Sequence, residues 1–598
     1  MAKPLWITDV NDLSKLFVSH QDRERARSKL RLANALDTET DEDGNITTLS
    51  DSDGNYIQLD EITPENVLKF LFSKRFQGSW NFFYNVTFDA EVTLKLFGDL
   101  LYDYKRTRLL TFHYDGYTIE YIPQKRITIR KGHHSAVFFD IAQFYHESLE
   151  DAYLHNIGEL PDWYLEIKKN RSHFTRKYTE KYPATVRNYC IQDCIYTKEL
   201  AEHWIKVFHE AFDFYPQRFI SSGYLAEKVC INKKIYIPLF PEIPFEINDF
   251  AWKSYYGARF EILKRGFIGA GHLYDINSAY PYSLSIIPDI TTGRWKKSKS
   301  IIDNALLGFF KILCDIPDCK YIPPFPFRAN GKLYFPSGKF ITYCTLAELK
   351  ACNNPKYYKI LESIQYLDNS PTYPYKEFIE SLYNKRKEFQ KLNNPLQLPL
   401  KIIMNSIYGK TAQRVGNRIG NLFSPVIAST ITGTTRAMLY DFVQKQGIEN
   451  EVVSFATDSI ITTKKLNIDS AKLGEFAYQN SGTDVYILQN GIYRFNGEWK
   501  KRGIGNLGNR QIEHLDTIEK NGQLYQIMKV LRVNRLRTAI LTNSINEIGQ
   551  FKTVERLVNL NADKKRQWFE DLKSINDSIM IDSLPISMNY FEKDRIGL

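Results

Sequence analysis

The stretch Leu400–Lys410, LKIIMNSIYGK, constrains this chain more than any other part of its sequence. Lys401, Asn405 and Tyr408 follow one another at four- and three-residue spacing, so on a helix they share one face. Gly409 predicts the end of that helix. A basic, an amide and an aromatic side chain in one stripe suit a ligand that carries both phosphate and base. A plain amphipathic surface helix needs no such combination.

Two further stretches each deliver one aspartate from a β-type segment. Residues 273–281, LYDINSAYP, are apolar up to Asp275 and then turn sharply at Tyr280. Residues 451–463, EVVSFATDSIITT, predict a hairpin with Asp458 at its polar tip. Taken alone, an aspartate at a strand end is more often a cap or turn residue.

Near the N-terminus, residues 32–40 read LANALDTET and predict a strand. Asp37 and Glu39 are two residues apart, so both carboxylates lie on one face of that strand. Two acids held together are costly unless a cation neutralises them. The alternative is a polar strand end that runs into acidic turns. The following DEDGN and SDSDGN segments contain Asp-Gly, which favours hairpins.

Two later patterns bring more acids. In NVTFD, Asn85 and Asp89 are four residues apart, on one helical face or across a tight turn. In NYCIQDC, Tyr189 and Asp193 are also four apart, and cysteine and isoleucine supply the buried side of a helix. Each pattern alone is weak evidence for a functional site, and the order of the patterns along the chain strengthens it.

In this order the three acidic patterns resemble the exonuclease motifs of family B DNA polymerases. The resemblance implies an RNase H-like 3′→5′ exonuclease domain with two metal ions. Tyr189 would orient the attacking water, and a helper lysine is expected at Lys168 or Lys169. Asn85 and Phe88 would hold the single-stranded 3′ end. The implied metal ligands are Asp37, Glu39, Asp89 and Asp193.

The later stretches resemble the polymerase motifs of the same family. Residues 273–281 are similar to motif A with Ala279 in place of leucine, and LKIIMNSIYGK matches motif B without departure. ATDS is similar to motif C, but Ala456 replaces its first aspartate. The resemblance implies two metal ions at Asp275 and Asp458. We expect Ala456 to weaken magnesium affinity or to shift the preference toward manganese.

Further roles follow from the same resemblance. The backbone of Ile276 would complete the metal sphere, and Tyr280 would stack under the incoming sugar. Lys401, with Arg386 from a predicted helix at 378–391, would bind the triphosphate, while Asn405 and Tyr408 would line the nascent base pair. Tyr255 and Gly257 belong to a YxGA pattern that contacts the template strand. Tyr493 and Lys501 resemble the region that holds the primer strand, although Gly491 stands where lysine is common.

Composition agrees with a nucleic-acid partner but does not require one. The 598-residue chain has a net charge of +10, which suits a polyanion or a mildly basic enzyme equally. Its seven cysteines are scattered without a zinc pattern, as in a reduced cytosolic protein. No apolar run reaches about 18 residues, so we expect no membrane span.

We therefore expect an α/β multidomain fold, with an RNase H-like 3′→5′ exonuclease domain followed by a right-hand polymerase with palm, fingers and thumb. The expected units are the exonuclease at 1–225, a connector at 226–270, the palm at 271–370 and 411–490, the fingers at 371–410, and the thumb with the C-terminal region at 491–598.

The expected activity is template-directed DNA synthesis with 3′→5′ proofreading, in the cytoplasm of a host cell if the chain is viral. Its partners would be primer–template DNA and dNTPs, with magnesium ions or manganese as a substitute. The size resembles the protein-primed phage and plasmid branch, in which a terminal protein is the primer. That branch carries an insertion after motif B, which is missing or reduced here. The alternatives are an exonuclease with a weakened polymerase site and a non-catalytic nucleic-acid-binding relative.

Overall fold

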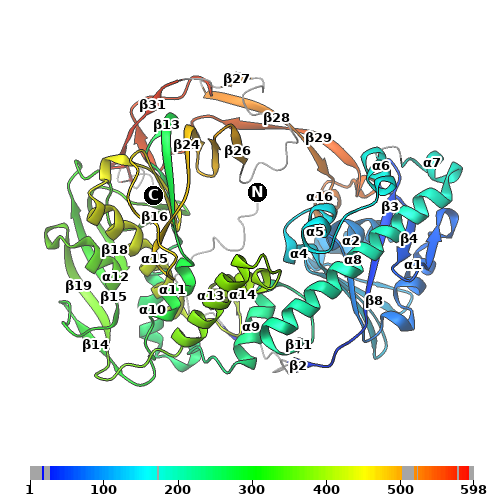
Figure 1. Cartoon of the computed structure of the whole chain (residues 1–598), viewed down its shortest axis with the longest axis horizontal. Helices are drawn as coiled ribbons and strands as arrows, with labels where there is room; N and C mark the ends of the chain where they lie inside the picture. Colours follow the sequence, from blue (N-terminus) through cyan, green and yellow to red (C-terminus); the bar gives the residue numbers. More distant parts are fainter. Residues whose placement is uncertain are drawn as a thin grey trace.

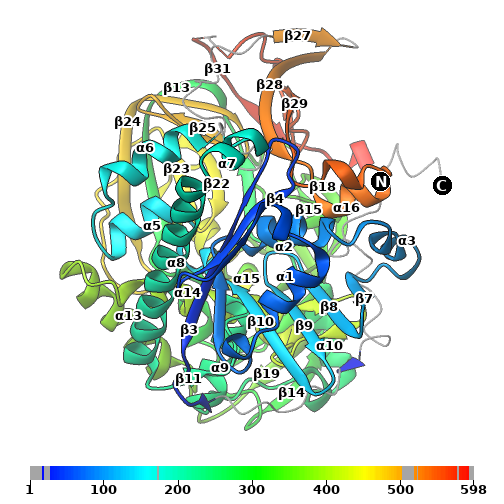
Figure 2. The ribbon, with the colours of Figure 1, turned by 90° about the vertical axis from the view of Figure 1, so that its right-hand side faces the viewer.

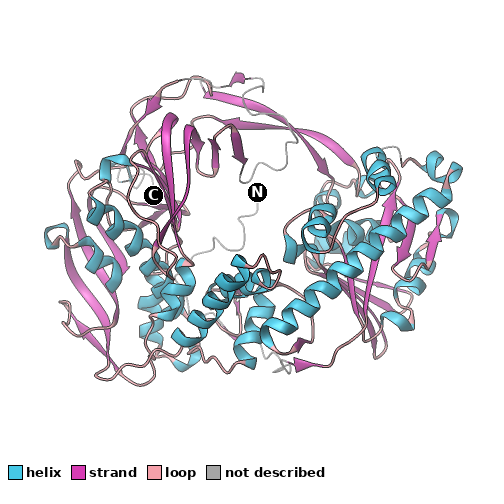
Figure 3. Cartoon of the chain, in the orientation of Figure 1, coloured by secondary structure: helices cyan, strands magenta, loops and turns pink. Residues whose placement is uncertain are grey.

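Two large β-sheets stand on opposite sides of the molecule, with helices between them (Figures 1 and 3). The computed structural model describes residues 17–18, 27–171, 174–501, 517–520, 523–575 and 578–591. The first sheet belongs to the N-terminal part of the chain. The second is built from segments between residues 259 and 581.

The N-terminal sheet has eight strands in the order β5-β4-β3-β6-β10-β9-β8-β7. Strand β3 runs parallel to β6, and β6 runs parallel to β10. The predicted strand and both Asp-Gly hairpins are confirmed, since Gly44 and Gly54 adopt positive φ in the turns. The strands are β3 (Ala33–Thr40), β4 (Ile46–Asp51), β5 (Tyr56–Gln58), β6 (Trp80–Phe83), β7 (Thr111–Tyr114), β8 (Tyr117–Ile122), β9 (Arg126–Lys131) and β10 (His134–Asp140).

The long helix α8 (Pro183–Phe212) crosses one face of this sheet beside β3 and β4 (Figure 2). Its lower half packs through Trp204, which is fully buried and stacks on Phe144 with ring centroids 4.7 Å apart. Trp204 and Phe144 belong to one core cluster with Trp80 and Phe82 of β6, and this shared burial holds the helix on the sheet. The predicted helix around Asp193 is thereby confirmed and faces β3.

The second sheet has the order β12-β22-β23-β13-β24-β25-β26, with β31 paired to β13. Strand β13 lies between β23 and β24, and the predicted strand and hairpin are both confirmed. β12 lies inside the expected connector and β25 and β26 inside the expected thumb, yet all three pair into this sheet. The strands are β12 (Arg259–Ile262), β13 (Arg265–Ile276), β22 (Val452–Thr457), β23 (Ser459–Thr462), β24 (Phe476–Gln489), β25 (Ile492–Phe495), β26 (Glu498–Lys501) and β31 (Met580–Ile581).

Two helices, α13 (Lys376–Lys391) and α14 (Gln397–Thr411), pack against each other below this sheet (Figure 1). The expected end of α14 at Gly409 is wrong, because the helix continues to Thr411. Gly409 is not among the residues with positive φ, and the Thr411 hydroxyl donates to the Tyr408 carbonyl at 2.7 Å. The helix therefore ends without using glycine as a left-handed cap.

The chain between β13 and β22 forms a separate four-stranded sheet in the order β14-β19-β15-β18. Helix α12 (Leu346–Cys352) lies between β18 and β19 in the chain. After α14 comes only the short hairpin of β20 (Arg414–Val415) and β21 (Arg418–Ile419), as the brief spacing indicates. The strands of the four-stranded sheet are β14 (Arg294–Ser298), β15 (Leu307–Ile316), β18 (Gly338–Thr345) and β19 (Tyr358–Leu367).

The helix α15 (Pro425–Gln446) packs against α11 (Ala279–Ser285), α12 and α10 (Phe245–Lys253) and ties the central helices together. At Gly433 this helix approaches the start of α12 so closely that a Cβ would overlap the side chain of Thr345.

We therefore predict that Gly433→Ala lowers the melting temperature, because overpacking a buried contact costs about 1–3 kcal/mol. Gly409→Ala is the matched control, since no atom lies within 4 Å of a Cβ at that helical position. Removing glycine from an open helical site stabilises by about 0.5–1 kcal/mol. Calorimetry of both variants checks this, and equal shifts in one direction would contradict it.

Candidate active sites

Three carboxylates from two elements meet on the N-terminal sheet. Asp37 and Glu39 lie on β3, and Asp193 lies on α8. One ligand oxygen from each lies within 4.8 Å of the others. Glu39 and Asp193 are buried and Asp37 is partly exposed, so the cluster opens to solvent on one side. The two-residue spacing on β3 produces the shared face that the sequence predicts.

A fourth carboxylate joins them from helix α2 (Val86–Lys95). Asp89 accepts hydrogen bonds from the Thr38 backbone N–H at 3.1 Å and from the Thr38 hydroxyl at 2.7 Å. Asn85 precedes the helix with a φ of 67°, and its N–H donates to Asp140 at 3.1 Å. Phe88 is half-buried, with its ring 6.2 Å from that of Phe551.

Burial raises the pKa of all four acids, and repulsion from neighbouring carboxylates of the cluster adds to it for Asp37 and Glu39. Burial is the largest cause for each; the charge of Asp193 further raises the pKa of Glu39 to about 8. The pKa of Asp89 rises to about 7, against the opposing hydrogen bond from Thr38. The pKa values of Asp37 and Asp193 also rise. The cluster therefore holds more negative charge than its surroundings compensate.

Aromatic residues and one lysine line the other side of Asp193. Tyr164, on α6 (Asp162–Asn170), donates its hydroxyl to Asp193 and stacks on Tyr189 with ring centroids 5.2 Å apart. The buried Tyr189 hydroxyl has no hydrogen-bond partner within the part of the chain that the structure describes. Lys168 reaches the Tyr164 hydroxyl at 3.4 Å, whereas Lys169 is exposed. Of the two candidate lysines, the structure places Lys168 at the site.

A second pair of acids meets in the second sheet. Asp275 is paired with Ser459 across β13 and β23, which brings it next to Asp458 in the turn before β23. The Ile276 N–H donates to the Asp458 carbonyl at 2.9 Å and closes this junction. Thr457 adopts a φ of 72°, which bends the chain at the turn. Burial, and then the charge of Asp458, raises the pKa of Asp275 to about 7, and burial also raises the pKa of Asp458.

Three tyrosines form the wall beside this pair. The rings of Tyr280 and Tyr408 have centroids 4.4 Å apart, and the Tyr408 hydroxyl lies 3.1 Å from that of Tyr255. The ring of Tyr255 in turn stacks flat on that of Trp252, with ring centroids 4.8 Å apart. The predicted residues Tyr255, Tyr280 and Tyr408 are thus brought together from three separate segments.

Basic residues from α13 and α14 face the same region. Arg386 donates to the Ser278 hydroxyl at 3.3 Å, just after Asp275. Lys401 and Asn405 are exposed on one face of α14, while Tyr408 on the same face is half-buried. This is the stripe that the sequence predicts, now oriented on the side of α14 away from its buried isoleucines.

The remaining predicted positions lie on the sheet itself. Ala456 pairs with Ser459 in the hairpin, and its carbonyl accepts from the Asp458 N–H at 2.9 Å. Tyr493 lies on β25 beside Lys500, whose ammonium is 5.9 Å from the ring centroid. Lys501 ends β26, and its side chain lies outside the described residues.

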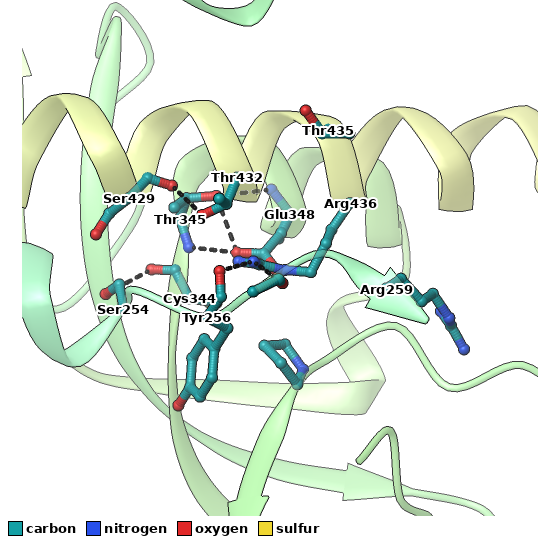
Figure 4. Close-up of polar contacts among 12 residues, drawn as sticks. Ser254, Tyr256, Arg259, Cys344, Thr345, Glu348, Ser429, Thr432, Thr435 and Arg436 are labelled. Carbon is teal, nitrogen blue, oxygen red and sulfur yellow. Dashed lines mark hydrogen bonds and ion pairs between the residues drawn. The ribbon is translucent and has the colours of Figure 1, made fainter. Parts of the chain in front are cut away.

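The structure also identifies a buried ion pair behind the YxGA pattern (Figure 4). Arg436 on α15 donates to Glu348 on α12 at 2.7 Å, and to the carbonyls of Tyr256 and Gly257 at 2.8 and 2.9 Å. Glu348 also accepts from the N–H and hydroxyl of Thr345. Arg436 therefore holds the backbone of Gly257 next to α12 and α15.

Our reading of the sequence missed Tyr164 and Arg436. The signal for Arg436 was present, because it is the only charged residue between Pro425 and Tyr440 in a run dominated by small and apolar residues. A lone arginine in such a buried helix requires a partner. Tyr164 had no such signal, since its role depends on how α6 folds back onto α8.

Both acidic groups fit divalent cations. Their carboxylate oxygens are the donors that hard cations such as Mg²⁺ prefer, and their raised pKa values indicate charge that a cation would neutralise. Asp37, Glu39, Asp89 and Asp193 could hold ions at the first site, and Asp275 and Asp458 at the second.

Two carboxylate sites on separate sheets define a multidomain α/β protein that can hold divalent cations in two places. The family model for DNA polymerase type B, organellar and viral, matches residues 144–495. That match covers more than half of the chain. The chain therefore belongs to the type B DNA polymerase family of organelles and viruses.

Individual relatives are more distant. The DNA polymerase of Acidianus bottle-shaped virus (isolate Italy/Pozzuoli) is 24% identical over 308 residues, which cover 46% of this chain and 44% of that protein. The matched part therefore spans less than half of that relative's length.

Solved structures share the fold over most of the chain. Phi29 DNA polymerase complexed with primer-template DNA and incoming nucleotide substrates matches with a TM-score of 0.60 and 14% identity, over 89% of this chain and 100% of that one. The same polymerase complexed with single-stranded DNA matches with a TM-score of 0.54 and 15% identity, over 83% and 98%. At such identity the likeness shows the fold alone. Among the described residues, no helix is long and apolar enough to cross a membrane.

Proposed function

We propose that this chain is a template-directed DNA polymerase with a 3′→5′ proofreading exonuclease. The observation that carries the proposal is the meeting of Asp275 and Asp458, distant in sequence, beside a wall of tyrosines and the basic face of α14. Family membership supports the polymerase, and the carboxylate cluster around Asp193 supports the exonuclease.

In the polymerase site, Asp275 and Asp458 are the residues that would hold divalent ions. When bound, such ions supply Lewis-acid stabilisation of the charge that develops on the transferred phosphoryl group. Lys401 and Arg386 bind the triphosphate of the incoming dNTP, and each brings a charge-assisted hydrogen bond. Tyr280, braced against Tyr408, presents a rigid ring to the sugar and leaves no room for a 2′-hydroxyl.

In the exonuclease site, the buried Tyr189 hydroxyl has no hydrogen-bond partner among the described residues and would orient the attacking water. Tyr164 fixes the orientation of Asp193 by donating to it. Lys168 adds positive charge beside Tyr164, which lowers the pKa of Asp193 against its burial. Asn85 and Phe88, at the start of α2 just before Asp89, would hold the displaced 3′ end.

The proposal includes replication of a viral or mobile-element genome in the host cytoplasm, with a terminal protein or another replication protein as a further partner. It also assigns 1–225 to the exonuclease, 226–270 to the connector, 271–370 and 411–490 to the palm, 371–410 to the fingers and 491–598 to the thumb and C-terminal region.

The test uses a 5′-labelled primer on a longer template, with magnesium, with and without dNTPs. We expect extension with dNTPs and shortening without them. Asp458→Ala should lose extension only, and Asp193→Ala should lose shortening only, because each removes one carboxylate of a different site. If the primer is shortened both with and without dNTPs, and manganese does not restore extension, the second candidate remains. That candidate is an exonuclease with a failed polymerase site.

Lys168→Ala should slow exonuclease activity on single-stranded DNA by about 10- to 100-fold, as expected when a partner of a metal-ligand group is removed. Lys169→Ala is the matched control, because Lys169 is exposed. Primer extension should stay unchanged in both variants. Equal exonuclease rates in the two variants would remove Lys168 from the site.

Ala456→Asp should improve magnesium-dependent synthesis, because it restores a negative charge two residues before Asp458. We expect the magnesium concentration for half-maximal extension to fall by up to about tenfold. Ala456→Asn controls for size without charge. Extension rates titrated with magnesium and with manganese check this, and an unchanged magnesium requirement would show that Ala456 does not limit metal binding.

A further inference from the structure

Two neighbouring strands of the N-terminal sheet, β6 and β10, end side by side. They run parallel, and Asp140 at the end of β10 is in register with Phe83 at the end of β6. The chain continues into α2 after β6 and into α4 (Ala142–Tyr145) after β10. Because the carboxyl ends of parallel strands meet at one edge of a sheet, the starts of these two helices are brought together.

The buried carboxylate of Asp140 joins the two helix starts. Asp140 is 4% exposed, and its Oδ1 accepts the Asn85 N–H at 3.1 Å and the Ala142 N–H at 3.0 Å. The first N–H groups of a helix have no partner within the helix, and a carboxylate is favoured there. Asp140 is not one of the four acids that could hold ions, so the mechanism above leaves it without a role.

Asn85 adopts a backbone conformation that few residues other than glycine accept. Its φ of 67° and ψ of 61° are left-handed, which asparagine tolerates better than most side chains. Asparagine at this position usually caps the helix with its side chain, but here that side chain makes no capping hydrogen bond to α2. The residue is exposed. Its amide is therefore available to a ligand.

The residues around Asn85 hold its backbone on both sides. Val86 is fully buried, and the Tyr84 hydroxyl donates to the carbonyl of Glu147 at 2.9 Å. The Phe88 N–H donates to the Asn85 carbonyl at 3.1 Å and starts the helix. The hydrogen bond to Asp140 completes this set, because it engages the Asn85 N–H itself.

The metal-ligand candidate on the same helix is held by other contacts. Asp89 accepts from the backbone and the hydroxyl of Thr38 on β3, at 3.1 and 2.7 Å. Neither contact involves Asp140. Loss of the Asp140 carboxylate should therefore disturb Asn85 more than the carboxylate cluster.

We propose that Asp140 is a positioning residue of the exonuclease site, which holds Asn85 in the left-handed conformation that presents its amide to the 3′-terminal nucleotide of single-stranded DNA. This inference rests on the proposed function and deepens it. A side-chain amide has donors and an acceptor, so it can pair with the sugar or the base edge of a nucleotide. Asp140 itself does not touch the DNA, because it is buried and bound to two backbone N–H groups.

The experiment measures degradation of a 5′-labelled single-stranded oligonucleotide over a range of concentrations, which separates KM from kcat. The dissociation constant of the same oligonucleotide is measured in EDTA, where no turnover occurs. The variants are Asp140→Ala and Asp140→Asn. Asp151→Asn is the matched control, because Asp151 is an exposed acid near the start of another helix, α5 (Leu149–Asn156), and accepts the Ser148 hydroxyl at 2.8 Å.

Asp140→Ala should raise KM and the dissociation constant by about 10- to 100-fold, the range that a hydrogen bond to a charged group contributes. Its kcat should stay close to that of the wild type. Asp140→Asn should have a smaller effect, because the amide oxygen of asparagine can still accept the two N–H groups. Asp151→Asn should match the wild type. A fall in kcat with unchanged KM would overturn the proposal, and so would wild-type values of both constants.

A double-mutant cycle shows whether Asp140 acts through Asn85. Asn85→Ala alone should raise KM at least as much as Asp140→Ala does. Adding Asp140→Ala to Asn85→Ala should produce no further rise, because the side chain that Asp140 positions is then absent. Effects that multiply would show that Asp140 acts independently of Asn85, as a purely structural residue would, and would overturn the proposal.

Primer extension by the same variants reports on folding. If Asp140→Ala loses extension as well, Asp140→Asn takes its place in the cycle. A wild-type enzyme that does not shorten single-stranded DNA would contradict the proposed exonuclease, and the role of Asp140 would fall with it. A wild-type enzyme that does shorten it, with equal KM values in all variants, would contradict the role of Asp140 alone.

Discussion

The alignment of β13 with β23 is the constraint on which the polymerase half depends. Pairing of Asp275 with Ser459 sets the two catalytic candidates side by side, and the Ile276 N–H locks the turn that carries Asp458. A one-residue slip would send one aspartate to the opposite face of the sheet. The buried neighbours Tyr274 and Ile460 prevent that slip, because both would lose their place in the core cluster.

In the N-terminal site, a helix instead of a second strand brings the further carboxylate to the first two. Strand spacing alone sets Asp37 and Glu39 on one face, and α8 then adds Asp193 from outside the sheet. Burial of the inner face of α8 keeps Asp193 in place, since Leu200 and Trp204 are fully buried, and the hydrogen bond from Tyr164 fixes the orientation of its carboxylate. Packing thus forces the carboxylates together, and a bound cation would relieve their repulsion.

The local elements of both sites could be predicted from the sequence because each depends on a short pattern. The strand at Asp37, the hairpin at Asp458 and the helix face at Lys401 all follow from periods of two or of three to four residues. The end of α14 did not follow, because a glycine can also remain helical. The docking of α16 (Leu536–Leu541) into the core of the N-terminal domain could not be predicted, because its apolar residues give no sign of which of two distant cores they join.

The buried pair of Arg436 and Glu348 illustrates what such polar contacts contribute. Replacing a buried ion pair with apolar side chains is often neutral or stabilising, so stability alone does not explain this pair. What an apolar side chain cannot do is donate hydrogen bonds to the carbonyls of Tyr256 and Gly257. Arg436 therefore fixes the path of the backbone next to Tyr255, whose hydroxyl meets Tyr408 on α14. Through this chain of contacts, the segment between the two domains is positioned by the same helices that hold the polymerase site.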